Sequence, residues 1–133
     1  MHPDVLAAYD LPARACLFEL DWEQARKLGK GTAGYEPLPR FPAVERDLAL
    51  VLPVSTPAAA VETVITEAAG ELLKTCTLFD VYQGAPVPAG YRSLAYSLVY
   101  QLPDRTLTDA EVNAAQERIQ AALKDRLGAS LRV

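Results

Sequence analysis

Few residues of this 133-residue chain have types and spacings that could carry out covalent or metal chemistry. His2 is the only histidine, so a Ser-His-Asp or Cys-His site would have to be built on a residue at the extreme end of the chain. Cys16 and Cys76 are far apart, match no disulfide framework, and offer no three- or four-ligand cluster with one histidine. We therefore expect no catalytic residue, no metal site and no cofactor in this chain.

Two further patterns have simpler explanations than chemistry. The run Gly-Lys-Gly-Thr at 29–32 lacks the G-x-x-x-x-G-K spacing of a phosphate-binding loop and follows no strand directly, which indicates a linker. Asp109 and Glu111 fit the start of a helix, and Glu67 and Glu71 fit a solvated helix face. None of these carboxylates predicts catalysis.

Asp80 is different, because it lies in an apolar, strand-like segment between Phe79 and Val81. Alternation along a strand places Asp80 on the face opposite these two neighbours, together with Leu78 and Tyr82. In the segment 92–101 the bulky residues alternate with small ones, and Ser93 falls on the small-residue face with Ala95 and Ser97. If the bulky residues face a helical layer, Asp80, Tyr82 and Ser93 converge on the open side.

Such a trio has the chemistry to read a nucleic-acid base. A carboxylate accepts hydrogen bonds from base amino or imino groups, a tyrosine ring stacks on a base, and a serine hydroxyl both donates and accepts. The alternative is that Asp80 pairs with Arg46 or Arg92 across neighbouring strands while Tyr82 only fills sheet surface. Alternation alone favours this alternative.

The elements that must position these residues follow from periodicity and end signals. The segment 108–111 is a capping box that predicts a long helix ending at Gly128, and Ser55 or Thr56 can cap an earlier helix that starts with Pro57. Strands are predicted at 46–52, 75–82, 92–101 and 129–133. The resulting order, β-α-β-β-α-β, predicts an α+β ferredoxin-like sandwich in which two helices cover one face of a four-stranded antiparallel sheet.

The first part of the chain has a different character. It contains a predicted strand at 15–20 and a short helix at 21–28 capped by Asp21, too little for a core of its own. A glycine- and proline-rich connector follows at 29–42. We expect two parts, 1–39 and 40–133, the first being the severed end of a larger preceding domain.

Charge and hydropathy limit the classes of function. The chain has 13 Lys and Arg against 17 Asp and Glu, a formal net charge of −4. This balance disfavours non-specific gripping of DNA or RNA, which depends on many Lys and Arg contacts to phosphate. No apolar run reaches the roughly 18 to 20 residues that span a bilayer, so we expect a cytoplasmic protein with no membrane partner.

Four motifs occur in order along the second part: FPAVERDLA at 41–49, LFDVYQG at 78–84, SLAY at 93–96 and TLTDAEVN at 106–113. Together they resemble the anticodon-binding ferredoxin-fold domain that closes the β subunit of bacterial phenylalanyl-tRNA synthetases, over about residues 40–133. Residues 2–21 similarly resemble the end of the catalytic-like module that precedes this domain. The resemblance identifies the chain as a C-terminal part of such a subunit.

This resemblance implies a partner and a role for the trio. The tRNA partner is phenylalanine-specific, and Asp80, Tyr82 and Ser93 match the family residues that contact the anticodon, chiefly its first base, guanine. It further implies an α subunit in an (αβ)₂ enzyme that uses ATP and magnesium outside this chain. Charge and position make Arg46, Arg92 and Arg105 the candidates for phosphate contacts.

Two rival functions share this predicted fold. An acylphosphatase-type enzyme would need an arginine in the loop 53–56 and an asparagine on the sheet, but the only asparagine is Asn113, on a helix. A regulatory or dimerising ferredoxin-like module would need a hydrophobic open face or a glycine-bearing ligand loop. Serines, Asp80 and Arg92 on the open face disfavour the module without excluding it.

Overall fold

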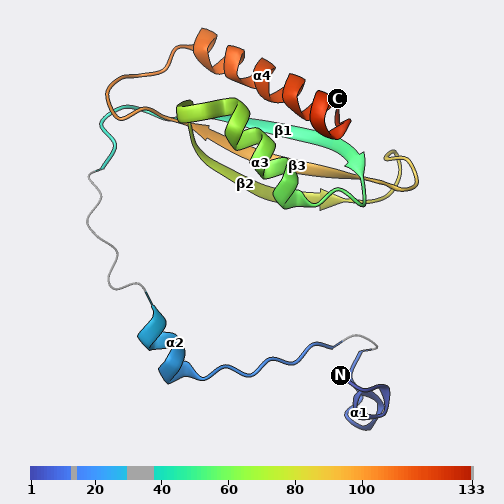
Figure 1. Ribbon diagram of the computed structural model, residues 1–133. Coiled ribbons are helices and arrows are strands. Elements are labelled where there is room, and N and C mark those ends of the chain that lie inside the picture. Colours follow the sequence, from blue (N-terminus) through green and yellow to red (C-terminus); the bar gives the residue numbers. More distant parts are fainter. Residues whose placement is uncertain (13–14, 30–37, 133) are drawn as a thin grey trace. The chain divides into compact units, whose positions relative to one another are not determined.

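The computed structural model describes residues 1–12, 15–29 and 38–132 (Figure 1). The chain divides into two units, Met1–Pro37 and Leu38–Val133. Their boundary lies inside the glycine- and proline-rich connector, two residues before the division expected at 39/40. Each unit is described by itself below.

In its described residues the first unit contains two short helices, α1 (Pro3–Ala8) and α2 (Trp22–Leu28). The predicted helix at 21–28 is confirmed, and its cap is Asp21, whose carboxylate accepts from the backbone N–H of Gln24 at 3.0 Å. Helix α1 was not predicted. The predicted strand at 15–20 is wrong: these residues belong to no strand, and Phe18 is 88% exposed. A strand needs a partner for its backbone groups, and this unit supplies none in its described part.

The second unit is the predicted α+β sandwich. Its antiparallel sheet has the order β2-β3-β1-β4, and α3 and α4 cover one face of it (Figure 1). This confirms the ferredoxin-like fold class. The elements are β1 (Val44–Pro53), α3 (Ala58–Ala69) with a 3₁₀ turn η1 (Gly70–Leu72), β2 (Leu73–Tyr82), β3 (Tyr91–Tyr100), α4 (Asp109–Leu127) and β4 (Ser130–Leu131).

The core lies between this sheet and the two helices. Alternate residues of β1 and β3 point into it, and the bulky residues of β3 are fully buried, as the alternation predicted. The helices contribute one apolar stripe each, which includes Val61 and Ile65 from α3 and Ile119 and Leu123 from α4. No helix in the described ranges combines the length and apolar character that a membrane crossing requires.

The ends of the helices follow the sequence signals in one case and not in the other. The capping box is confirmed, because the Thr108 hydroxyl accepts from the backbone N–H of Glu111 at 3.4 Å while the Glu111 carboxylate accepts from the Thr108 N–H at 2.9 Å. Gly128 ends α4 at φ 62°, a left-handed conformation that glycine adopts without strain. Helix α3 instead begins after Pro57 with no side-chain cap, so the predicted cap by Ser55 or Thr56 is wrong.

A β-bulge in β2 changes the alternation that the sequence predicts. The register runs from Leu78 opposite Tyr96 directly to Asp80 opposite Ala95, which leaves Phe79 as an extra residue. Leu78 therefore packs against the core, although we expected it on the open face. Phe79 was expected to face the helices, but it is 57% exposed and lies outside the core cluster. After the bulge, Asp80 and Tyr82 remain on the open face.

Candidate nucleic-acid interface

The register of the sheet brings the predicted trio together at one end of the open face. Tyr82 on β2 lies opposite Ser93 on β3, and Asp80 lies opposite Ala95 one step earlier. On the other side of β3, Ser93 pairs with Val51 of β1. Two neighbouring rows of the open face thus contain all three residues.

The Tyr82 ring is held in place by the loop that follows it. Its hydroxyl donates to the backbone carbonyl of Ala85 at 2.7 Å, while the side chain remains 37% exposed. Gly84 makes this turn possible, because its φ is 144° and a Cβ there would lie 3.0 Å from the Tyr82 hydroxyl. The loop therefore fixes the ring and leaves part of its surface available.

The structure adds a residue that the sequence did not predict. Arg132, directly after β4, extends across the open face, and its Nη1 donates to the Ser93 hydroxyl at 3.4 Å. Its guanidinium carbon also lies 5.4 Å from the centroid of the Tyr82 ring, a cation–π distance. Ser93 is only 2% exposed. The Ser93 hydroxyl is thus engaged by Arg132 and barely reaches solvent.

The only sequence signal for Arg132 was its alternation with Leu131 in the last predicted strand. Leu131 pairs with Leu50, a core residue, so Arg132 falls on the opposite, open face. Its backbone N–H donates to the Ala49 carbonyl at 2.9 Å. What the sequence could not reveal is that the long side chain of Arg132 extends past β1 to contact Ser93 on β3 and Tyr82 on β2.

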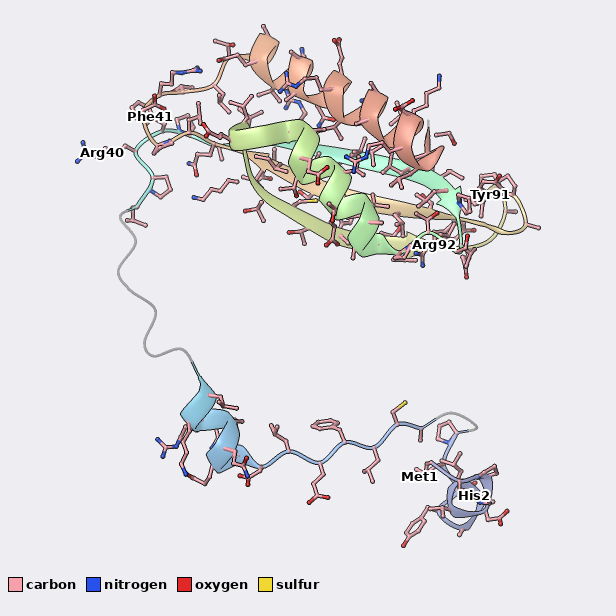
Figure 2. The ribbon with its side chains drawn as sticks, viewed as in Figure 1. Met1, His2, Arg40, Phe41, Tyr91 and Arg92 are labelled. Carbon is pink, nitrogen blue, oxygen red and sulfur yellow. The ribbon has the colours of Figure 1, made fainter. Side chains whose placement is uncertain are left out.

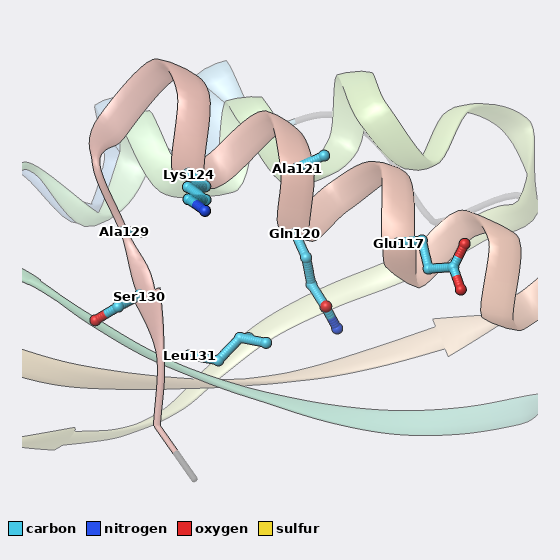
Figure 3. Close-up of a pocket in the computed structure, with 7 residues that line it drawn as sticks. All are labelled: Glu117, Gln120, Ala121, Lys124, Ala129, Ser130 and Leu131. Carbon is cyan, nitrogen blue, oxygen red and sulfur yellow. The ribbon is translucent and has the colours of Figure 1, made fainter.

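The segment that carries Arg132 is lightly packed. Strand β4 has only two residues, and a cavity of about 420 Å³ lies between it and α4 (Figure 3). The cavity is lined by Glu117, Gln120 and Lys124 of α4 and by Ser130 and Leu131 of β4, among others. Short pairing and few buried apolar contacts are features of segments with low local stability. The Arg132 side chain is therefore attached to the least extensively paired strand of the sheet.

The three arginines expected near phosphate all make contacts within the protein. Arg46 lies 3.3 Å from the Asp109 carboxylate, and Arg105 donates to both carboxylate oxygens of Glu111, at 3.0 and 2.6 Å. Arg92 donates to the Thr56 carbonyl at 2.6 Å. None of these contacts involves the trio.

Two expectations about these arginines are wrong: that Arg92 lies on the open face, and that Asp80 pairs with Arg46 or Arg92. Arg46 and Arg92 lie opposite Leu98 and Leu52, both core residues, so both arginines are on the helix-covered side and not beside Asp80. The pairing of Asp80 with either of them is thereby contradicted. Figure 2 shows Arg92 beside Tyr91 at the loop end of the sheet. The strand that carries Arg92 begins at Tyr91, so the alternation that buries Leu94 also includes Arg92.

Titratable groups with displaced pKa values belong to the scaffold. Burial raises the pKa of Tyr96 and of Tyr100 to about 12, and burial raises that of Cys76 to about 11. Hydrogen bonds from Arg105 and then from Thr108 lower the pKa of Glu111 to about 2. These shifts arise at the core and at the capping box of α4. Within the described ranges, no three His, Cys, Asp or Glu residues form a group that could hold a metal ion.

Comparison with known proteins agrees with this architecture. Residues 39–132 match the model of the ferredoxin-fold anticodon binding domain. Over 99% of its length the chain is 76% identical to the phenylalanine–tRNA ligase beta subunit of Moorella thermoacetica, 48% to that of Symbiobacterium thermophilum and 46% to that of Geobacillus kaustophilus. It covers 15–16% of those relatives' own length. The chain belongs to the family of ferredoxin-fold anticodon-binding domains.

Proposed function

We propose that this chain recognises the anticodon stem-loop of the phenylalanine-accepting tRNA. The observation that carries the proposal is the convergence of Asp80, Tyr82 and Ser93 at one end of the open sheet face. Support also comes from the relatives, which are beta subunits of phenylalanine–tRNA ligases, and from the family whose model matches residues 39–132.

Each member of the trio has a distinct part in reading the first anticodon base, guanine. The partly exposed ring of Tyr82 offers a stacking surface, and the Asp80 carboxylate accepts from the imino and amino groups that guanine presents on its pairing edge. The Ser93 hydroxyl, released from Arg132, donates to or accepts from the same edge. Uracil and cytosine lack the two neighbouring N–H donors from which a carboxylate can accept two hydrogen bonds at once. This arrangement therefore favours guanine.

Phosphate contacts are a second part of the proposal. Arg132 brings a positive charge to a face on which Asp47 and Asp80 are acidic, and it lies beside the base site. Arg46 and Arg105 remain predicted phosphate contacts, but each must share its guanidinium with a carboxylate, and Arg92 must share its own with a backbone carbonyl. Arg132 is the best placed of the four for phosphate near the base.

The wider context is that of the whole enzyme. We propose that the chain acts within the β subunit of an (αβ)₂ phenylalanine–tRNA ligase in the cytoplasm. In that enzyme residues 1–39 end the preceding catalytic-like module, and the α subunit joins phenylalanine to tRNA with ATP and magnesium. Neither ATP nor magnesium takes part in a step assigned to this chain.

The rival function, a regulatory or dimerising module, has less support from the open face. The rows there contain Asp47 opposite Ser97 and Ser97 opposite Thr77, and the next rows contain Asp80 and Arg132. A face that pairs with a second apolar surface is expected to be rich in large hydrophobic residues. Base recognition uses hydrogen-bonding side chains of the kind found here.

The proposal is tested by titrating the chain, at low and moderate salt, with a phenylalanine tRNA anticodon hairpin and with the same hairpin carrying a changed first anticodon base. We expect preference for the native hairpin with a shallow salt dependence, because base contacts and few phosphates contribute. Equal binding of both hairpins, or steep salt dependence without selectivity, contradicts base reading by this chain.

A further inference from the structure

The chemistry of the trio is repeated further along the same face. The trio combines an aromatic ring, an aspartate and a serine, namely Tyr82, Asp80 and Ser93. A second set with the same composition consists of Phe79 on β2, Asp47 on β1 and Ser97 on β3. No part of the proposed function uses this second set.

The register places the second set next to the first. Asp47 lies opposite Ser97, and Ser97 lies opposite Thr77, so these three residues form one row across β1, β3 and β2. The next row, two residues further along β3, contains Ala95 with Asp80 on one side and Ala49 on the other. Two residues along a strand span about 7 Å, which is a short step for consecutive bases of an extended RNA loop.

The bulge supplies the aromatic member. Leu78 packs against the core, so alternation turns Phe79 to the open face, and the bulge keeps it directly before Asp80. The ring is 57% exposed, a large apolar surface left to solvent. A base stacks on such a ring regardless of its identity. Phe79 therefore lies between Asp80 and the row that contains Asp47 and Ser97. There its ring offers a stacking surface for a base held by Asp47 and Ser97.

We infer that Asp47, Ser97 and Phe79 form a second base subsite, which reads the adenine at the second anticodon position. The inference rests on the proposed function, because it takes the first base to be held by Asp80, Tyr82 and Ser93. The phenylalanine codons fix the second anticodon base as adenine. Its exocyclic amino group donates to the exposed Asp47 carboxylate, Ser97 bonds a ring nitrogen, and Phe79 stacks. Uracil presents a carbonyl where adenine has the amino group, so the carboxylate rejects it.

The test measures binding of the full chain to three hairpins: the parent, one with uracil at the second position, and one with unsubstituted purine there, which lacks only the amino group. We expect about a tenfold loss for the purine hairpin, the size of a good base contact. For the Asp47→Ala variant we expect the affinity for the parent hairpin to fall by a similar factor. This variant should bind the parent and purine hairpins equally.

The chain offers a matched control on the same strand. Glu45 is exposed, lies two residues before Asp47 and faces Val99, outside the proposed subsite. Glu45→Ala removes the same charge, so it reports any general change in the repulsion of phosphate. We expect this variant to retain the tenfold difference in affinity between the parent and purine hairpins. Phe79→Leu should weaken all three hairpins by about tenfold while it keeps their ratios, because stacking is tolerant of base identity.

Each outcome separates the subsite from the function on which it rests. If the wild type binds the parent and purine hairpins equally but discriminates the first base, the subsite is wrong and the proposed function stands. The same conclusion follows if Glu45→Ala abolishes the purine effect as Asp47→Ala does. If the wild type discriminates neither base, the proposed function itself is contradicted.

Discussion

The two faces of the sheet use the same strands for different purposes. On β3, Leu94, Tyr96 and Leu98 point toward the helices and are fully buried, while the residues between them form the floor of the open face. The core side is almost wholly apolar, whereas the open side combines carboxylates, hydroxyls and exposed rings. Adjacent residues thus differ in their roles: one set packs the core, and the other carries the proposed binding surface.

The largest effect should come from a change on the helix-covered face. Leu94→Ala removes a fully buried side chain between the sheet and the helices, and we expect a loss of about 2 to 5 kcal/mol in the free energy of unfolding. Denaturant unfolding monitored by circular dichroism measures the loss. Ala95→Ser, the neighbouring change on the open face, should stay within about 0.5 kcal/mol of wild type. Similar losses for both would contradict the separation of the two faces.

A change on the open face should have the reverse profile. Tyr82→Ala removes the stacking surface, so we expect hairpin affinity to fall by the equivalent of about 1 to 3 kcal/mol while thermal stability changes little. Asp80→Ala should also weaken binding and reduce the preference for guanine at the first anticodon position. In the proposed phenylalanine–tRNA ligase both should lower the efficiency of aminoacylation.

The control for Tyr82 is the exposed Tyr9 in the first unit, where the side chain is 74% exposed. Tyr9→Ala deletes an exposed tyrosine from the same chain, and its affinity should match that of wild type. Unchanged binding by Tyr82→Ala, with a normal melting curve, would remove Tyr82 from the interface.

Periodicity and end signals predicted most of the second unit because local and tertiary forces agree there. The capping box of α4, the alternation of β3 and the order of elements could all be inferred from neighbouring residues. Where an extra residue enters a ladder, alternation fails: the bulge at Phe79 reversed the expected faces of Leu78 and Phe79. Arg132 was missed because its contacts depend on the reach of its side chain across two strands and not on local spacing.

The placement of Asp80 and Tyr82 on the open face was predicted for a partly accidental reason. Alternation counted back from Tyr82 placed Asp80 correctly, because the bulge lies before both residues. Arg92 was placed on the wrong face, although the alternation of β3 already puts it on the side of Leu94. The strand predicted at 15–20 does not form, because an apolar strand pattern needs a partner strand and the described residues of the first unit supply none.

Glu111, at the start of α4 on the helix-covered side, should make the stability of the domain depend on pH. Hydrogen bonds from Arg105 and Thr108 lower the pKa of Glu111 from 4.5 to about 2. A lowered folded-state pKa contributes stability above the unfolded value, and this contribution is lost as the pH falls from about 4.5 to about 2. Glu111→Gln should therefore melt below wild type at neutral pH, and the two melting curves should converge near pH 2. A constant difference across this range would contradict the assigned pKa.

The smallest effect separates two tyrosines on the helix-covered face of β3. The Tyr96 hydroxyl donates to the Ala58 carbonyl at 3.3 Å, whereas the buried Tyr100 hydroxyl has no hydrogen-bond partner among the described residues. Tyr96→Phe should cost about 1 kcal/mol, the net value of a typical hydrogen bond. Tyr100→Phe should instead stabilise the domain by up to about 1 kcal/mol, because it removes a buried polar group that is not satisfied. Paired denaturant titrations measure both, and a loss of equal size for both would show that the Tyr100 hydroxyl is satisfied in solution.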